Sequence, residues 1–236
     1  DVQPKIKELV DTLFKTVPAG VGSKGFVKIN KQQFADLVEH GAKWCVDQGY
    51  GWEEDLGRLE SNGVIQQADS SKISDKAFQR GINQLGTLGS GNHYLEIQHV
   101  RKENIVDEEL ARHFGIFPDQ IVVMFHCGSR GFGHQIGTDY LRVFDSAMKK
   151  YGITVNDREL ACAPFQSKEG QDYFKAMACA ANMAFANRQV ILHRIREGFE
   201  KVFNQKADDM EMHCIYDVCH NLARISKFEV DGRKKE

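Results

Sequence analysis

The spacing of hydrophobic positions predicts helices over much of this chain, together with a few short strands. Apolar residues recur every three or four positions near the start, at Ile6, Leu9, Val10, Leu13 and Phe14, which is typical of an amphipathic helix. Further helices are expected over residues 31–49, 74–85, 105–114, 139–150 and, as one long helix or two, 169–203. Short β-prone runs predict strands over residues 93–100, 120–127 and 211–219.

The order of these elements favours the α+β class. Helices and strands follow one another without the regular strand–helix–strand rhythm that builds a doubly wound parallel sheet. Glycine-rich stretches at 18–25 and 86–91 predict turns, and residues 49–57 predict a polar loop. The closing FEVDGRKKE predicts a strand that enters a turn without a return strand, and residue 1 is not methionine. We therefore expect both ends to be cuts in a longer protein.

Composition and charge bound the class of protein. The 236 residues are 42% hydrophobic and 27% charged, which is ordinary for a soluble globular protein of one large or two small domains. The net charge of −2 gives no global sign of nucleic-acid binding, although a local arginine-lined groove would not show in the total. No apolar run approaches the roughly 20 residues that span a bilayer, and no secretory signal is present. The six cysteines form no CxxC pair, which fits reduced thiols in the cytoplasm or the nucleus.

Three histidines stand where an apolar, β-prone run meets a turn that contains glycine or asparagine. They are His93 in LGTLGSGNHYLEI, His126 in IVVMFHCGSRGFGHQIGTDY and His220 in IYDVCHNLAR. A rigid strand end positions an imidazole before a metal ion arrives, so the recurrence predicts a metal site. The loops beside two of these histidines suit phosphate, which indicates a metal-dependent enzyme that acts on phosphorylated substrates.

The segment GTLGSGN before His93 has two interpretations. It lacks the Lys-Ser/Thr ending of a Walker loop, and a strand rather than a helix follows it. Its glycines allow backbone N–H groups to converge on an anion, to which Asn92 would add its amide, but a plain tight turn also explains them. In the strand that follows, alternation puts Tyr94 and Glu96 on the face opposite His93. There Glu96 would accept hydrogen bonds from a purine edge while Tyr94 packs on the ring; a solvated Glu96 is the alternative.

Arg130 follows His126 by four residues and is flanked by two glycines in HCGSRG. A guanidinium in this setting suits bidentate phosphate recognition, with a surface-loop arginine as the alternative. His134 lies further along the same loop and is expected to support the ligands from outside.

The segment around His220 superficially suggests a zinc knot. Cys214 and Cys219 are an odd number of residues apart, so in a strand they would point to opposite faces, and a four-ligand site is not expected. Asp217 is expected to orient a ligand or to join a polar network.

Five long motifs together resemble the RtcB-type RNA ligases, the tRNA-splicing ligases. They are LGTLGSGNHYLEI, HCGSRGFGHQ, NDRELAC, EGQDYFKAM and YDVCHN, in this order along the chain. The opening segment DVQPKIKELVDTLFKTVPAGVGSKG also resembles the part of the family that follows its first metal-binding motif. The resemblance implies an α+β fold with a mixed sheet core and surrounding helices. Residues 1–236 would then be the central part of one catalytic domain, truncated at both ends.

The resemblance also implies a role for each matching residue. The expected ligands of a dinuclear manganese centre are His93, His126 and His220. The expected nucleotide-binding residues are Asn92, Tyr94, Glu96 and Asn221, and the arginines expected to face phosphate or RNA are Arg80 and Arg130. One mild departure is Arg224, which stands where family members commonly carry lysine.

Members of this family use GTP and manganese to join a 2′,3′-cyclic phosphate or 3′-phosphate RNA end to a 5′-hydroxyl end. They attach GMP to a histidine, transfer it to the RNA 3′-phosphate, and let the 5′-hydroxyl displace it. The partners implied are tRNA exon halves, GTP and accessory proteins, with no membrane. Two other functions use the same residues: a metal-dependent phosphoesterase that needs no GTP, and a non-catalytic, metal-stabilised subunit of an RNA-processing complex.

The resemblance predicts that this polypeptide of 236 residues does not ligate RNA by itself. It places the family's metal-bridging cysteine, in a D-x-G-C motif, upstream of residue 1, and the histidine that accepts GMP beyond residue 236. A ligation assay with the exact polypeptide, GTP and manganese checks this expectation. Robust joining of RNA ends would contradict the assignment of roles.

Overall fold

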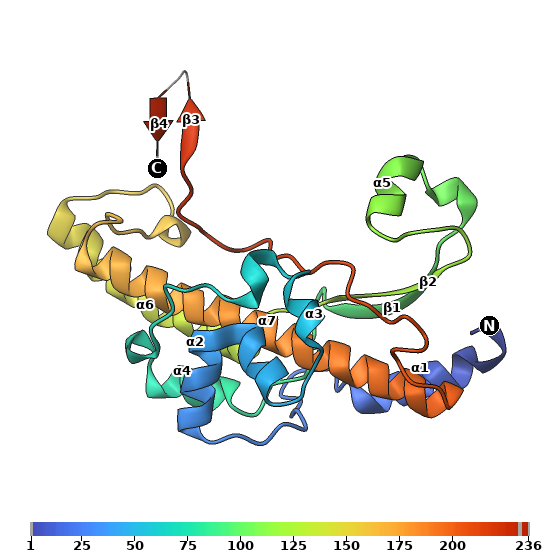
Figure 1. The fold of residues 1–236 in the computed structure, drawn as a ribbon. Helices are drawn as coiled ribbons and strands as arrows, with labels where there is room; N and C mark the ends of the chain where they lie inside the picture. Colours follow the sequence, from blue (N-terminus) through green and yellow to red (C-terminus); the bar gives the residue numbers. More distant parts are fainter. Residues whose placement is uncertain (1, 231–232, 236) are drawn as a thin grey trace.

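The computed structural model describes residues 2–230 and 233–235 and confirms the α+β class (Figure 1). Its α-helices are α1 (Ile6–Thr16), α2 (Lys31–Asp47), α3 (Glu53–Leu56), α4 (Asp75–Gly81), α5 (Glu108–His113), α6 (Arg130–Tyr151) and α7 (Lys168–Phe203). Its strands are β1 (Tyr94–His99), β2 (Ile121–His126), β3 (Phe228–Val230) and β4 (Arg233–Lys235). Short 3-10 turns occupy Gln3–Lys5, Glu60–Gly63, Ser70–Lys72, Lys102–Asn104 and Arg158–Leu160.

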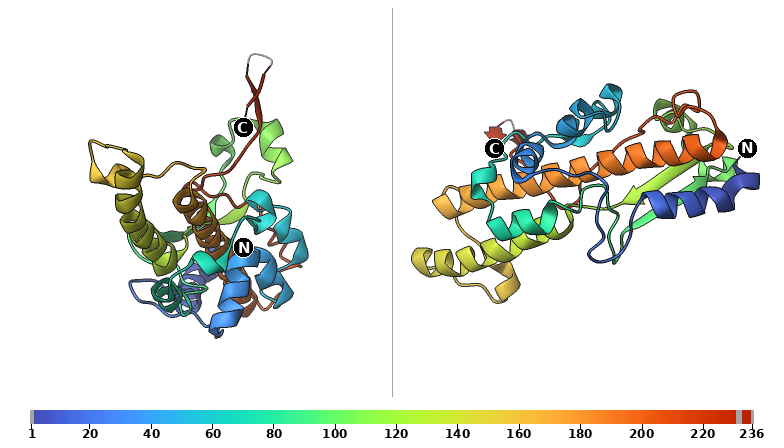
Figure 2. Two further views of the ribbon diagram at one scale, coloured as in Figure 1. Left: turned by 90° about the vertical axis from the view of Figure 1, so that its left-hand side faces the viewer. Right: turned by 90° about the horizontal axis from the view of Figure 1, so that it is seen from below.

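Helix α7 runs through the middle of the molecule, and the other long helices pack along it (Figures 1 and 2). Its 36 residues span about 54 Å at the usual rise per residue. Ser167 caps its N-terminus by accepting a hydrogen bond from the Gly170 N–H at 3.1 Å, and Asn204 caps its C-terminus in the left-handed conformation. Residues 169–203 therefore form one helix rather than two.

Three buried apolar clusters surround α7. The largest joins α2, α4 and α6 to the first half of α7, and at its centre the rings of Phe34 and Phe132 meet edge to face with centroids 5.2 Å apart. A second cluster packs α1 and the inner face of the β1–β2 ribbon on the second half of α7, through Leu9, Leu13 and Ile195. A third lies under the turn at Glu60–Gly63. These clusters make α7 the common support of all the loops described below.

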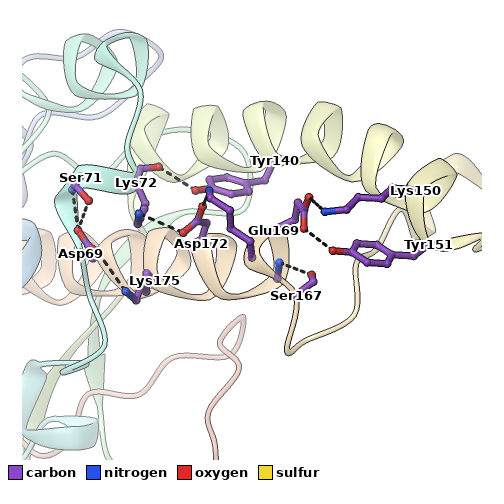
Figure 3. A network of polar contacts seen from close by, with 12 residues as sticks. Asp69, Ser71, Lys72, Tyr140, Lys150, Tyr151, Ser167, Glu169, Asp172 and Lys175 are labelled. Atoms are coloured by element: carbon purple, nitrogen blue, oxygen red, sulfur yellow. Dashed lines mark hydrogen bonds and ion pairs between the residues drawn. The ribbon is translucent and has the colours of Figure 1, made fainter.

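Polar contacts close the edge between α6 and α7 (Figure 3). The Tyr140 hydroxyl donates to the Lys72 carbonyl at 3.0 Å, and the Lys72 ammonium lies 3.3 Å from Asp172. Tyr151 donates to Glu169 at 3.0 Å. Burial raises the pKa of Tyr140 to about 12, so its hydroxyl remains a donor at neutral pH. Partly exposed ion pairs of this kind each contribute at most about 1 kcal/mol, so the network aligns the helices more than it stabilises them.

Strands β1 and β2 form an antiparallel ribbon that carries α5 at its far end (Figure 1). The register pairs Tyr94 with His126, so the start of β1 lies beside the end of β2. Leu95 and Ile97 pack on the cluster around α1 and α7, whereas Gln98 donates to Glu96 at 2.8 Å on the other face. The alternation that the sequence predicted for this strand is confirmed.

Helix α6 is longer than the predicted 139–150 and begins at Arg130. The expected loop after Ser129 is therefore the first two turns of a helix. Phe132, Ile136 and Tyr140 are buried at helical spacing, but glycines interleaved with them weaken both the periodicity and the helix propensity on which a sequence prediction rests.

Residues 211–219 were predicted to form a strand, and this prediction is wrong. The segment makes a single bridge, between Leu59 and Asp217, and the side chains of Tyr216 and Val218 are 60% and 59% exposed. Tyr216 and Val218 therefore face away from the core, whereas Met212, Cys214 and Cys219 pack at its edge, and polar contacts hold the segment in place of a strand partner.

The strand expected near the end of the chain does have a return strand among the described residues. Phe228 pairs with Lys235 and Val230 pairs with Arg233 in the short β3–β4 hairpin. The absence of a return strand, which the sequence suggested, is thus also a wrong prediction. Separately, no helix within residues 2–230 or 233–235 is both long enough and apolar enough to cross a membrane.

A buried ion pair joins α7 to α3 and to the segment after α7. Arg196 donates to both carboxylate oxygens of Asp55 at 2.7 Å, and the two side chains are 4% and 0% exposed. Arg196 also donates to the Met212 carbonyl at 2.9 and 3.0 Å, and its guanidinium carbon lies 3.4 Å from the centroid of the Trp52 ring. Burial acts most strongly on Asp55 and opposes its charge, but the hydrogen bonds and charge of Arg196 and its other donors together lower its pKa.

We expect Arg196→Met to reduce the free energy of unfolding by about 3–5 kcal/mol at pH 7, because it leaves the Asp55 carboxylate buried without its partner. In the parent protein the lowered pKa of Asp55 stabilises the fold above the unfolded-state value of about 3.9. That contribution is lost as the pH falls through the folded-state pKa. In the variant an unpaired, buried Asp55 has a raised pKa, so the difference between the two proteins should shrink as the pH falls. Denaturant unfolding at several pH values measures it, and a pH-independent difference would contradict this account.

Candidate metal and nucleotide site

The three histidines singled out from the sequence lie together in the structure. His93 comes from the turn before β1, His126 from the end of β2, and His220 from the segment after α7. The His126 ring lies between the others, with centroids 5.4 Å from His93 and 5.1 Å from His220. The Nε2 atoms of His126 and His220 are 3.2 Å apart.

The spacing of this last pair fits two ligands of one metal ion. Metal–imidazole bonds of about 2.0–2.1 Å at tetrahedral or octahedral angles hold two nitrogens about 2.8–3.4 Å apart. The same 3.2 Å also suits a hydrogen bond between two neutral rings, so the pair either shares a proton or coordinates an ion. Among the residues that the structure describes, no three His, Cys, Asp or Glu side chains are grouped to hold one ion. His126 and His220 are thus the converging pair, and His93 is the neighbour of His126.

His93 lies against Arg130. The Arg130 Nη1 atom is 3.4 Å from His93 Nδ1, and Arg130 Nε donates to the Thr87 hydroxyl at 3.1 Å. Burial, and then the positive charge of Arg130, lower the pKa of His93. The imidazole is therefore neutral at neutral pH, which is the form that binds metal ions.

Gly89, in the segment GTLGSGN, makes this contact possible. A Cβ atom at Gly89 would lie 1.9 Å from Arg130 Nη1 and 2.6 Å from His93 Nδ1, and its φ of +106° belongs to the region that favours glycine. Gly91 also has a positive φ, +78°, but a Cβ there would meet nothing within 4 Å. One glycine of the motif thus makes room for a side chain, in addition to shaping the turn.

Arg130 opens the first turn of α6, and Arg80 lies against that turn. Arg80 lies on α4 and is exposed; its Nη1 donates to Gln135 at 3.0 Å and lies 3.3 Å from His134 Nδ1. A Cβ built on Gly131, in that first turn, would lie 3.4 Å from Arg80 Nε. His134, which the sequence suggested as an outer support of the metal ligands, is instead placed against Arg80.

The remaining predicted residues lie within three positions of a histidine along the chain, on or beside β1 or next to His220. The Tyr94 ring is 5.8 Å from the His126 ring, and Glu96 is exposed one step further along the same face of β1. Asn92 and Asn221 adjoin His93 and His220 in sequence, and both are exposed. An open groove of about 1780 Å³ passes the three histidines, Tyr94 and Asn221, whereas Asn92, Glu96, Arg80 and Arg130 are not among its lining residues.

Sequence reasoning missed a buried residue of α7 that holds the loops of the site. The Asn187 side-chain oxygen accepts from the N–H groups of Gly86 and Thr87 at 2.7 and 3.1 Å. Its amide nitrogen donates to the carbonyls of Thr87 and Gly128 at 3.0 and 3.1 Å. Asn187 thereby joins the turn before His93 to the turn after β2. The available signal was the polar run Asn-Arg-Gln inside an apolar helix, because polar residues buried there must find partners.

We expect Gly89→Ala to destabilise the protein more than Gly91→Ala. Both substitutions place a Cβ at a positive φ, which costs about 1–2 kcal/mol, but only the first also displaces Arg130 from His93. The free energy of unfolding of both variants, with the pKa of His93 followed by NMR, measures the difference. Equal losses of unfolding free energy in the two variants, with an unchanged pKa of His93 in Gly89→Ala, would contradict this expectation. They would show that the contact between Arg130 and His93 does not need the space above Gly89.

Comparison with known proteins assigns the chain to a family. The family model described as tRNA-splicing ligase RtcB matches residues 1–235. Similar proteins named tRNA-splicing ligase RtcB include those of Thermococcus kodakarensis, 57% identical over 234 residues, and Methanocaldococcus jannaschii, 56% identical over 234 residues, each across 99% of this chain. That of Aeropyrum pernix is 50% identical across the whole chain.

This chain spans 48% of the length of the Thermococcus protein, 49% of the Aeropyrum protein and 24% of the Methanocaldococcus protein. The match of the family model over nearly the whole chain, and the identity to these relatives, establish the family independently of the site geometry. The chain belongs to the tRNA-splicing ligase RtcB family.

Proposed function

We propose that this chain forms part of a GTP- and manganese-dependent RNA ligase that joins 2′,3′-cyclic phosphate or 3′-phosphate ends to 5′-hydroxyl ends. The observation that carries the proposal is the approach of His126 to His220 beside His93 and Arg130, in a chain of this family. The proposed substrates are tRNA exon halves and GTP, and the proposed partners are accessory proteins. The proposed location is the cytoplasm, or the nucleus in a eukaryote.

The donor set of the site fits manganese. Imidazole nitrogens are acceptable ligands of this ion, the 3.2 Å separation of the two Nε2 atoms suits neighbouring ligands, and the lowered pKa of His93 keeps its ring neutral. When bound, manganese would neutralise phosphate charge and orient an in-line displacement. In a dinuclear centre of the kind the family resemblance implies, His126 and His220 would share one ion and His93 would serve the other, each with further ligands from outside these residues.

The polar residues around the histidines suit a nucleotide and a phosphorylated RNA end. Arg130, half-buried and already directed at His93, would bind phosphate with less loss of side-chain entropy than a freely moving arginine. Glu96 is an exposed acceptor oriented by Gln98 at 2.8 Å, and its two oxygens complement the N–H edge of guanine, with Tyr94 as the neighbouring ring. Asn92 and Asn221 would donate their amides to the nucleotide.

The chemistry asked of these residues is positioning and charge stabilisation. An RNA 3′-phosphate is a poor electrophile, and its conversion to an RNA–GMP anhydride provides a leaving group for the attack of the 5′-hydroxyl. The bond formed is a 3′,5′-phosphodiester and the group released is GMP. Arginines and asparagines of this chain would hold the reacting phosphates in line, which is the main contribution of a protein to phosphoryl transfer. The histidine that carries GMP is proposed to lie outside residues 1–236.

The experiment is to incubate the full-length protein with manganese and α-labelled GTP and to look for acid-labile label on the protein. We expect label that depends on manganese and disappears in His126→Ala. His99→Ala is the matched control, because His99 lies at the other end of the same ribbon, where it contacts Asp119 at 3.1 Å, and its loss should leave labelling unchanged.

Two outcomes would contradict the proposal. Hydrolysis of phosphate esters without any label would identify a metal-dependent phosphoesterase that shares the histidines. If His126→Ala is fully labelled and differs from the parent protein only in stability, these histidines have a structural role.

A further inference from the structure

The segment that carries His220 positions this side chain closely, although it has no regular secondary structure. After α7 the chain turns back and runs along the helix toward β3 (Figure 1). No helix or strand is assigned over residues 204–227, yet this segment delivers His220 Nε2 to 3.2 Å from His126 Nε2. Apart from the single bridge between Leu59 and Asp217, contacts other than backbone pairing must therefore fix its position.

One guanidinium, that of Arg188 on α7, contacts both histidine-bearing segments. Its Nε lies 2.7 Å from each carboxylate oxygen of Asp217, and its Nη2 lies 2.7 Å from one of them. Nη2 also donates to the Cys219 sulfur at 3.3 Å, and Nη1 donates to the Cys127 carbonyl at 3.3 Å. Cys127 directly follows one histidine of the pair, and Cys219 directly precedes the other.

Burial makes it costly to separate Arg188 from Asp217. The side chains of Arg188 and Asp217 are 9% and 13% exposed, and the Arg188 guanidinium carbon lies 5.0 Å from the centroid of the Phe185 ring. A charge that is nearly removed from water is costly without its partner, so any displacement of the segment that separated the pair would be strongly unfavourable. The segment can therefore adopt only a small range of positions relative to α7.

The turn at Glu60–Gly63 holds the same segment from the other side. Asp217 N–H donates to the Arg58 carbonyl at 3.1 Å, and Glu60 N–H donates to the Asp217 carbonyl at 2.8 Å. The Glu60 carboxylate accepts from Cys219 N–H at 2.8 Å. These bonds set the direction of the backbone, and the contact with Arg188 sets how closely it approaches β2.

We propose that Arg188 and Asp217 are positioning residues of the histidine site: their ion pair sets the separation of His126 and His220 and so prepares that pair to bind a metal ion. The identity of the ion rests on the proposed function, whereas the geometric claim does not. Lysine cannot take the place of Arg188, because a single ammonium lacks the planar fork that reaches a carbonyl, a carboxylate and a thiol at once.

The test uses the full-length protein with Arg188→Lys, Arg188→Met and Asp217→Asn. Arg196→Met is the matched control, because it breaks the other buried arginine–aspartate pair of α7 without touching the segment between Asp217 and His220. Two readouts are needed: hydrogen exchange of the Asp217 and Cys219 amides without metal, and manganese affinity by titration calorimetry.

We expect both amides to exchange at least about tenfold faster in the Arg188 and Asp217 variants, and manganese affinity to fall about 10–100-fold, as when an outer partner of a metal ligand is lost. Arg196→Met should keep wild-type exchange at these two amides and wild-type manganese affinity despite its lower stability.

If the single variants fail to fold, Arg188→Met/Asp217→Leu keeps the proposal testable, because replacing both charges avoids a buried unpaired one. This double variant should fold and still bind manganese weakly. Wild-type exchange and affinity in Arg188→Lys or in the double variant would overturn the positioning role, as would equal effects of Arg196→Met. A parent protein that binds no manganese at all would count against the proposed function, and the exchange rates would still decide the geometric claim.

Discussion

The structure depends on the hydrogen-bond partners that four polar side chains buried along α7 find. This helix lies inside three apolar clusters, yet it carries Asn182, Asn187, Arg188 and Arg196 on its buried surface. Asn182 bonds to the backbone at Val38, Glu39 and Ile65, and the other three bind the loops of the histidine site and the segment after the helix. Because an unpaired polar group in this position is costly, each of these side chains selects one placement of a segment that has little regular structure.

The candidate site is the product of those placements. Asn187 holds the turns that adjoin β1 and β2, and Arg188 brings the irregular segment of His220 to the end of β2. The ribbon register then sets Tyr94 beside His126. A site assembled this way exists before a ligand arrives, which is the condition for a small loss of entropy on binding and for stabilising charge during a reaction.

Much of this could be predicted from the sequence, and the failures have identifiable causes. The helices, the ribbon and the histidine neighbourhood follow from periodicity and from residue types at strand ends. The segment at 211–219 has the β-prone residues of a strand, but a strand needs a partner, and the sequence does not reveal that Arg188 and the turn at Glu60–Gly63 take that place. The start of α6 was not predicted because its glycines weaken the hydrophobic periodicity and the helix propensity. Asn187 and Arg188 were overlooked because a polar run inside a helix does not show which of its residues face the core.

The central claim is that the imidazoles of His126 and His220 form a metal-binding pair. The most direct measurement is anomalous X-ray scattering from crystals of the full-length protein grown with manganese, with data collected on both sides of the manganese absorption edge. The account predicts an anomalous peak within bonding distance, about 2.2 Å, of the Nε2 atoms of both histidines. Manganese bound elsewhere, with the two rings still hydrogen-bonded to each other at 3.2 Å, would contradict it.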